Sequence, residues 1–351
     1  MSGLTGEKRF GKAYGALLGL AMGDALGFPA MYHRTLLTGR PKRRQRLWEF
    51  SAQADQNRIN KMALPFTLSQ PEENLHLCGT DDTEFAAVTA LILAECGAEI
   101  SLENLFAGWR RHVVDCVADG EEIWSGIGER ASIENARKGL RPPRTGNDNP
   151  HHFDDGAVAR AVPIGLRYAD SPERAAEAAG WMACITNAAD GIWAAQAMAA
   201  SIAAAVQDAP PAEVVEIGVK QLPVDSWTAR KVNQARHLLE QAGDGFAAVP
   251  LWNNRVVNGI YSYGNVAPET LAVAYAIFLS VEGRLQAGLQ LAALVPKQAD
   301  SMPAMVGALC GARQGDSVVP PEWRATLDML KGVCVPHLKG LSLRRIVERL
   351  M

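Results

Sequence analysis

An all-α, single-domain fold is predicted by three features of the sequence of 351 residues. The apolar residues of its long segments recur with the period of a helix, about 3.6 residues, and the alternating, β-branched runs typical of strands are almost missing. Alanine-rich stretches fill the middle of the chain, and prolines stand where helices start, at Pro210, Pro268 and Pro303. We therefore expect on the order of a dozen helices in one bundle spanning residues 1–351.

The first predicted helix, residues 11–27, consists of small residues whose recurrent glycines permit very close approach of another helix. Asp24 is the only carboxylate in this apolar setting. It is either a hydrogen-bonded core aspartate or a residue that contributes to a ligand site. Residues 32–77 look irregular, and long connections of this kind are often functional lids or rims.

Helical signals dominate the rest of the chain. Ser101 is the predicted N-cap of a helix over residues 102–117. The segment 191–206 is apolar nearly all round because of its alanines, so it should lie at the centre of the bundle. The other predicted helices cover residues 121–138, 157–168, 172–185, 210–221, 226–242, 268–281, 285–294 and 302–313.

A cluster of oxygen-bearing side chains opens the strongly apolar helix that follows residue 80. Thr80, Asp81 and Asp82 offer several oxygen ligands within one helical turn, which suits a hard divalent cation such as Mg²⁺ or Mn²⁺. The alternative is an ordinary helix start, with Thr80 or Asp81 as N-cap and Asp81-x-x-Glu84 as a capping box. The residues alone leave both interpretations open.

Composition excludes several classes of function. A net charge of -3 marks neither a nucleic-acid binder nor a membrane-surface binder. No apolar run approaches the roughly 18 residues of a membrane span, and we expect neither a signal peptide nor an anchor. The six cysteines form no Cys-x-x-Cys pair, which argues against a zinc site and against a disulfide scaffold. We expect them to be buried thiols in a reducing cytoplasm. The sequence leaves the oligomeric state open.

Four elements, in order, give the chain its resemblance to the ADP-ribosylglycohydrolase family, which includes the glycohydrolase that reactivates dinitrogenase reductase. They are Gly-Asp-Ala-Leu-Gly at 23–27, Gly-Thr-Asp-Asp-Thr at 79–83, the segment 156–166 with its arginine and proline, and the segment 300–312. The resemblance implies an orthogonal helical bundle that holds one or two Mg²⁺ or Mn²⁺ ions. It also implies cleavage of a glycosidic bond to C1 of ADP-ribose.

The resemblance assigns roles to individual residues. Thr80, Asp81 and Asp82 match one half of the family's metal site, and Asp300 with Ser301 matches part of the other half. Asp81 and Asp82 are also the candidate catalytic carboxylates. The candidate substrate-binding residues are Asp155 and Gly156.

The chain departs from the family pattern at five positions. Gln298 replaces one of the carboxylates near Asp300, Met31 stands where an acid is often found, and Gly126 replaces the aspartate of an Asp-Ile-Gly element. Asn187 follows Thr186 where histidine is usual, and Asp155 replaces asparagine. With one carboxylate fewer, we expect one tightly held cation and a second that is weak or missing.

Two functions of different classes follow from these residues. The first is a metal-dependent hydrolase acting on ADP-ribosylated protein, a free ADP-ribosyl compound or a smaller nucleoside. The second is a catalytically silent relative that keeps the fold for binding or structure. Hydrolysis through an oxocarbenium-like state calls for a carboxylic acid near the leaving group. The sequence offers Glu84, Asp115, Asp119, Asp154 and Asp155 for that task without choosing among them.

Overall fold

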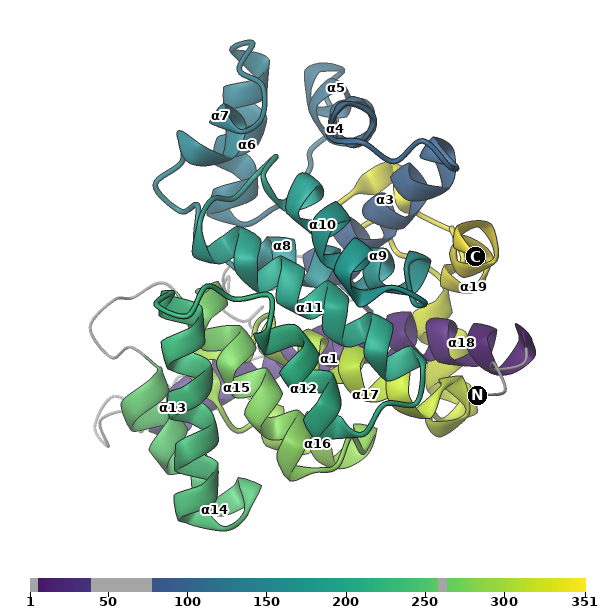
Figure 1. The fold of residues 1–351 in the computed structure, drawn as a ribbon. Coiled ribbons are helices and arrows are strands. Elements are labelled where there is room, and N and C mark those ends of the chain that lie inside the picture. The colour runs from purple at the N-terminus through teal and green to yellow at the C-terminus, as the bar shows by residue number, and fades with distance from the viewer. Residues whose placement is uncertain (1–5, 39–77, 258–263) are drawn as a thin grey trace, which may run out of the picture.

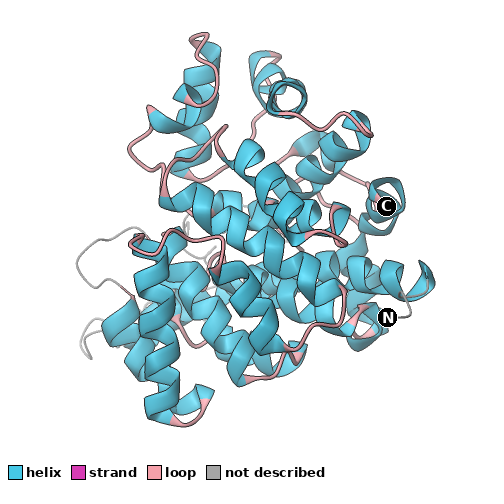
Figure 2. Ribbon diagram, in the orientation of Figure 1, coloured by secondary structure: helices cyan, strands magenta, loops and turns pink. Residues whose placement is uncertain are grey.

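The computed structural model describes residues 6–38, 78–257 and 264–351, and its regular elements in these ranges are all helices (Figure 1 and Figure 2). The all-helical prediction is therefore confirmed over the described chain, where the only β-type pairs are two isolated bridges. That residues 1–351 form a single domain stays a prediction. None of the described helices combines the length and the apolar character needed to cross a membrane.

The α-helices are α1 (Gly6–Thr38), α3 (Asp81–Cys96), α4 (Leu102–Trp109), α5 (Asp115–Ala118), α6 (Ile127–Arg137), α7 (Arg144–Asn147), α8 (Gly156–Arg160), α9 (Val162–Arg167), α10 (Pro172–Ala183), α11 (Asp190–Val206), α12 (Pro211–Val219), α13 (Trp227–Ala242), α14 (Gly245–Leu251), α15 (Ala267–Ser280), α16 (Leu285–Ala292), α17 (Met302–Gln314), α18 (Pro321–Asp328) and α19 (Leu343–Leu350). The π-helices η2 (Arg110–Val114) and η3 (Trp252–Val256) and the 3-10 helices η4 (Pro296–Gln298), η5 (Asp316–Val318) and η6 (Pro336–Leu338) lie between them.

Helix α11 lies at the centre of the bundle, as its alanines predict (Figure 1). Helices α8, α9, α10, α12, α15 and α17 pack against it. Its buried alanines are Ala194, Ala195, Ala197, Ala199, Ala200, Ala203, Ala204 and Ala205. Small side chains on all sides allow a central helix to contact several neighbours at once, so composition explains this position.

Helices α1 and α17 pack backbone to backbone through their glycines. A Cβ atom on Gly19 would lie 2.1 Å from the carbonyl oxygen of Gly307, and one on Gly311 would lie 2.0 Å from that of Gly15. Both distances are far below van der Waals contact, so glycine is required at this seam. The contact brings the start of α17 beside the middle of α1, which is where the candidate site lies.

The sequence prediction is wrong at two helix boundaries. Helix α1 continues to Thr38, so residues 32–38 are helical; residues 39–77 of the predicted loop lie outside the described chain. Extending a formed helix needs no new nucleation, which lets a weakly periodic segment follow it. The predicted helix 121–138 begins only at Ile127. Ser101 does cap α4, accepting a hydrogen bond from the backbone N–H of Asn104 at 3.3 Å.

Candidate active site

A polar cavity of about 30 Å³ lies at the N-terminal ends of α3, α6, α8 and α17, beside the segment that precedes α15. Its lining consists of Asp81, Asp82, Phe85, Gly126, Glu129, Asp154, Asp155, Gly156, Arg160, Asn265 and Ser301. This volume suffices for a cation or for one or two water molecules. Five of the candidate site residues from the sequence therefore meet at one place although they come from three distant segments: Asp81, Asp82, Asp155, Gly156 and Ser301.

Asp24 fixes the position of the acidic helix start. Its carboxylate accepts hydrogen bonds from the backbone N–H groups of Thr80 (2.6 Å) and Thr83 (3.0 Å). It also accepts from both threonine hydroxyls at 2.5 Å. Thr80 is the N-cap residue of α3 but makes no side-chain cap bond of its own. A carboxylate from α1 thus caps α3, and Asp24 is a hydrogen-bonded core aspartate.

Asp81 and Asp82 start α3 directly beside this cap. Asp82 is 7% exposed, whereas Asp81 is half-buried, and its Oδ1 lies 3.2 Å from the hydroxyl oxygen of Thr80. Burial raises the pKa of Asp81. Burial raises the pKa of Asp82 well above its usual value, and Asp81, Asp24, Asp155 and Asp300 raise it further. These carboxylates are thus close enough to repel one another.

The segment before α17 places Asp300 and Ser301 near the carboxylates of Asp81 and Asp82. Asn265 donates its amide to Oδ2 of Asp300 at 2.8 Å, and the same nitrogen lies 3.3 Å from the hydroxyl of Ser301. Burial raises the pKa of Asp300 to about 7, with a further contribution from Asp81. Asn265, which orients both side chains, belongs to no motif, and no signal in the sequence marks it.

Asp155 faces the cavity from the residue before α8. It is 2% exposed and accepts a hydrogen bond at 2.7 Å from the hydroxyl of Thr270 on α15. Burial raises its pKa well above the usual value, and Asp154 and Asp300 add to the shift. Gly156 begins α8 and also lines the cavity.

Within the part of the chain that the structure describes, no positive charge offsets these carboxylates. The charged neighbours that shift the pKa values of Asp24, Asp82, Asp155 and Asp300 are other carboxylates in every case. Buried negative charge of this density is costly unless the groups take up protons or surround a cation. All the donors are oxygens, the donor set that Mg²⁺ and Mn²⁺ prefer, so the residues fit such an ion.

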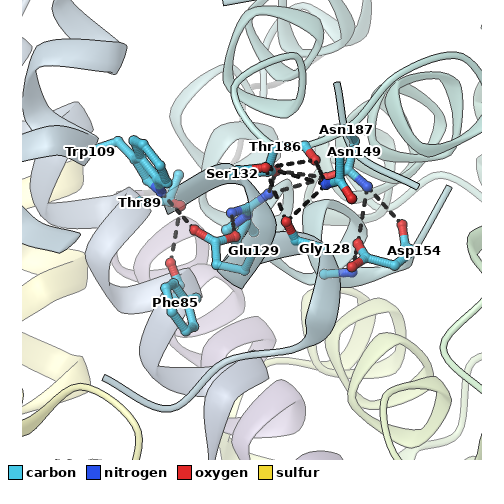
Figure 3. A network of polar contacts seen from close by, with 12 residues as sticks. Phe85, Thr89, Trp109, Gly128, Glu129, Ser132, Asn149, Asp154, Thr186 and Asn187 are labelled. Carbon is cyan, nitrogen blue, oxygen red and sulfur yellow. Dashed lines mark hydrogen bonds and ion pairs between the residues drawn. The ribbon is translucent and has the colours of Figure 1, made fainter. Parts of the chain in front are cut away.

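A buried ion pair also lines the cavity, and sequence reasoning missed it (Figure 3). Arg160 on α8 pairs with Glu129 on α6 and donates to the hydroxyl of Thr186. Trp109 donates its indole N–H to the other oxygen of Glu129 at 2.7 Å. The Nε atom of Arg160 is buried and has no hydrogen-bond partner in the described chain. An orphaned donor beside a polar cavity leaves a hydrogen bond open to a group outside the described residues.

Asp154 lies close to the ion pair and to the carboxylate of Asp155. It is 5% exposed, and Asn187 donates to its Oδ1 at 3.0 Å and to its backbone oxygen at 2.9 Å (Figure 3). A Cβ on Gly128 would lie 1.9 Å from Oδ2 of Asp154, so only glycine lets α6 approach this carboxylate. Burial raises the pKa of Asp154 to about 6, against the effects of Asn187 and Arg160, which lower it.

The comparison with known sequences decides the family. The family model described as ADP-ribosylglycohydrolase matches residues 5–351. The chain belongs to the ADP-ribosylglycohydrolase family. The resemblance carried by the four sequence elements is thereby confirmed. Within this family, the ADP-ribosylarginine hydrolase Tri1 of Pseudomonas putida (strain GB-1) is 27% identical over 331 residues, covering 91% of this chain and 75% of the relative.

A solved structure agrees with the assignment at the level of the fold. It is described as an ADP-ribosylglycohydrolase-related protein complex and matches with a TM-score of 0.60. The match covers 98% of this chain and all of the other at 20% identity. The predicted ADP-ribosylglycohydrolase type of helical fold is therefore confirmed.

The structure separates the remaining acid candidates of this family member. Glu84 is fully buried and accepts hydrogen bonds from three consecutive backbone N–H groups at 2.7–3.0 Å, which ties the segment 333–335 to α3. Asp115 and Asp119 are exposed at the ends of α5 and are absent from the cavity lining. Only Asp154 and Asp155 of the five candidates line the cavity.

The departures from the family pattern have different locations. Gln298 is 2% exposed and donates its amide to Oε2 of Glu269 at 3.2 Å. Gly126 lines the cavity and Asn187 holds Asp154, so both belong to the site. The side chain of Met31 lies outside what the structure describes.

Proposed function

We propose that this ADP-ribosylglycohydrolase family member is a divalent-cation-dependent hydrolase that cleaves the glycosidic bond between the ribose of an ADP-ribosyl group and its acceptor. One observation carries the proposal. Asp81, Asp82 and Asp155, for which the described residues supply no positive partner, line one cavity together with Asp154 and the Arg160–Glu129 pair. A site that only stabilised the fold would gain nothing from this uncompensated charge.

The cation would be held by oxygens of Thr80, Asp81, Asp82, Asp300 and Ser301. When bound, it would supply electrostatic stabilisation and orient the ribose hydroxyls. Asp24 and Asn265 act as positioning residues because they hold the side chains of proposed ligands: Asp24 binds Thr80, and Asn265, which also lines the cavity, binds Asp300. Asp155 and Gly156 are the proposed contacts to the substrate, with Asp155 fixed by Thr270.

Asp154 is the proposed proton donor to the leaving group. It lines the same cavity as Asp81 and Asp82, and its Oδ1 is held by Asn187 while Oδ2 faces the closely packed start of α6. A pKa of about 6 lets this carboxyl carry a proton in part of the molecules near neutral pH. Asp81 or Asp82 then remains the carboxylate available to activate water.

The relative named ADP-ribosylarginine hydrolase suggests the first substrate to test. Purified protein with Mn²⁺ is expected to release ADP-ribose from a peptide ADP-ribosylated on arginine, and EDTA should stop the release. A peptide ADP-ribosylated on serine and a simple nucleoside test the alternative acceptors. Mn²⁺ binding without cleavage of any of the three would instead favour a catalytically silent relative.

Replacing Asp154 by Asn is predicted to separate activity from stability. The pKa of Asp154, about 6, lies above its ordinary value of 3.8. The protonated carboxyl therefore contributes to the stability of the folded protein, and this contribution is fully present below about pH 3.8 and is lost as pH rises through about 6. The neutral amide avoids this loss. In EDTA at pH 8, Asp154→Asn should therefore be more stable by about 1 to 3 kcal/mol, whereas hydrolysis should fall at least about 100-fold.

Urea unfolding at pH 8 and pH 5, with far-UV circular dichroism as the probe, measures this difference. The advantage of the Asn variant should shrink at pH 5. Mn²⁺ affinity should stay within a small factor of the wild type because Asp154 is not a proposed ligand. A variant that keeps full hydrolysis would exclude Asp154 as the proton donor.

The number of bound cations is a separate prediction. Two divalent ions about 4 Å apart repel strongly unless carboxylates lie around them, and Gln298 supplies an amide where the family supplies an acid. Titration calorimetry with Mn²⁺ is expected to show one tight ion and a second that is weak or missing. Two equally tight ions would mean that other residues compensate for Gln298.

Gln298→Asp is the matched variant for this titration. It should strengthen the weak ion, yet lower stability by about 1 to 3 kcal/mol, because Glu269 loses the buried amide that now donates to it. Unchanged stoichiometry and affinity would show that residue 298 does not occupy the family's ligand position.

A further inference from the structure

A second group of potential metal ligands lies outside the candidate active site. Among the described residues, Cys116, Glu121 and His337 each offer a ligand atom, and these atoms all lie within 4.8 Å of one another. Cys116 comes from α5, Glu121 from the loop after it, and His337 from η6 near the C-terminus. All three are half-buried, and none lines the acidic cavity.

The backbone around Cys116 holds this group together. The π-helix η2 directly precedes α5, and the thiol of Cys116 lies 3.4 Å from the carbonyl oxygen of Arg111 within it. The N–H of Glu121 donates to the carbonyl of Cys116 at 2.9 Å, which turns the chain back on the end of α5. π-helical turns are rare and are often kept at functional positions because they redirect side chains.

One ring nitrogen of His337 has a hydrogen-bonding partner, and the other has none among the described residues. Its Nδ1 lies 3.1 Å from Oε2 of Glu121, while its Nε2 is buried with no hydrogen-bond partner in the described chain. The ring packs against that of His112 at a centroid distance of 5.9 Å. His112 itself is engaged through Nε2 with Glu95 at 2.9 Å. A half-buried imidazole with an orphaned nitrogen calls for a further partner.

The charges around the thiol favour a cation. The carboxylates of Glu121, Asp119 and Asp115 all lie close enough to act on the thiol of Cys116. This concentration of negative charge would attract a divalent ion.

We propose that Cys116, Glu121 and His337 bind a Zn²⁺ ion, at a site separate from the oxygen-lined cavity. Sulfur, imidazole and carboxylate together are the donor set of zinc, whereas Mg²⁺ and Mn²⁺ prefer oxygen donors. Zinc bonds of about 2.0 to 2.3 Å require only a small closing movement of the three side chains. The half-exposed position leaves a fourth place for water.

The ion would fasten the C-terminal segment to α5. His337 follows the segment 333–335, whose backbone N–H groups bind Glu84 on α3. Zinc would add a second attachment of the same segment. Zinc binding is therefore expected to raise the thermal midpoint of the folded protein.

The test uses the full chain, stripped with EDTA, kept reduced and then supplied with excess Mg²⁺ to occupy oxygen sites. One equivalent of Zn²⁺ should bind, as measured by competition with a chromophoric zinc indicator, and should raise the thermal midpoint. Co²⁺ in place of Zn²⁺ should produce a thiolate-to-cobalt charge-transfer band. Cys116→Ser should abolish the band, the equivalent of zinc and the shift in the midpoint.

Matched variants make each result decisive. Cys96→Ser removes another half-buried thiol outside the group and should leave zinc binding unchanged. Glu121→Gln and His337→Ala should each weaken zinc binding at least about tenfold, while Mn²⁺ binding at the acidic cavity reports that the fold is intact. The proposal is overturned if the wild type binds no zinc, or if Cys116→Ser and His337→Ala bind it as the wild type does. Neither outcome bears on the proposed hydrolase function.

Discussion

Asp82→Asn is expected to lower Mn²⁺-dependent hydrolysis and Mn²⁺ affinity at least about 100-fold each. Asp82 is almost fully buried at the start of α3 and lies near Asp81, Asp155 and Asp300, which raise its pKa. An amide keeps the shape of the side chain but removes the charge at the centre of the group. Calorimetric titration with Mn²⁺ and the ADP-ribose release assay measure the two effects.

The same variant should be more stable than the wild type in EDTA at pH 8, because a buried charge among like charges has been removed. Asp225→Asn is the control, since Asp225 is exposed and lies away from the cavity lining. It should change neither binding nor stability. If Asp82→Asn kept wild-type Mn²⁺ affinity, the acidic helix start would not be the cation site.

Gly19→Ala is expected to destabilise the protein by at least about 3 kcal/mol. Its Cβ would stand 2.1 Å from the carbonyl oxygen of Gly307, and a backbone atom of a packed helix has no rotamer by which to move away. Helices α1 and α17 must therefore separate. Denaturant unfolding measures the loss.

Separation of the two helices should also weaken Mn²⁺ binding. Helix α1 carries Asp24, which fixes Thr80 and Thr83, and Ser301 is the N-cap residue of α17. The control is Gly6→Ala at the start of α1, where a Cβ would meet nothing within 4 Å. That change should be neutral or slightly stabilising. A Gly19→Ala protein as stable as the Gly6→Ala protein would refute the close seam.

The sequence by itself was sufficient for the fold class, because helices have a local signature. The 3.6-residue period, the prolines at helix starts and the alanines of 191–206 each reflect interactions within one helix or on its whole surface. It was equally sufficient for naming Thr80, Asp81 and Asp82 as a unit, since their oxygens lie within one turn. The sequence did not predict the C-terminal end of α1 or the start of α6, because the ends of a helix depend on what the helix packs against.

The sequence also suggested which distant residues meet, but only through the family resemblance that joins 80–82 with 300–301. The residues of each segment, considered separately, do not predict that the two segments meet. In the structure, Asp300 shifts the pKa of Asp82, and the backbone seam of α1 and α17 places both segments at one cavity. Their proposed role as cation ligands stays a prediction.

The surroundings of each acid depend on how the helices pack. Asp24 caps another helix, Glu84 anchors three backbone N–H groups, and Asp154 is a buried group held by Asn187 close to an ion pair. These carboxylates have the same chemistry in the sequence. Burial and partners from remote segments give them different pKa values and different tasks, and both arise only when the helices pack.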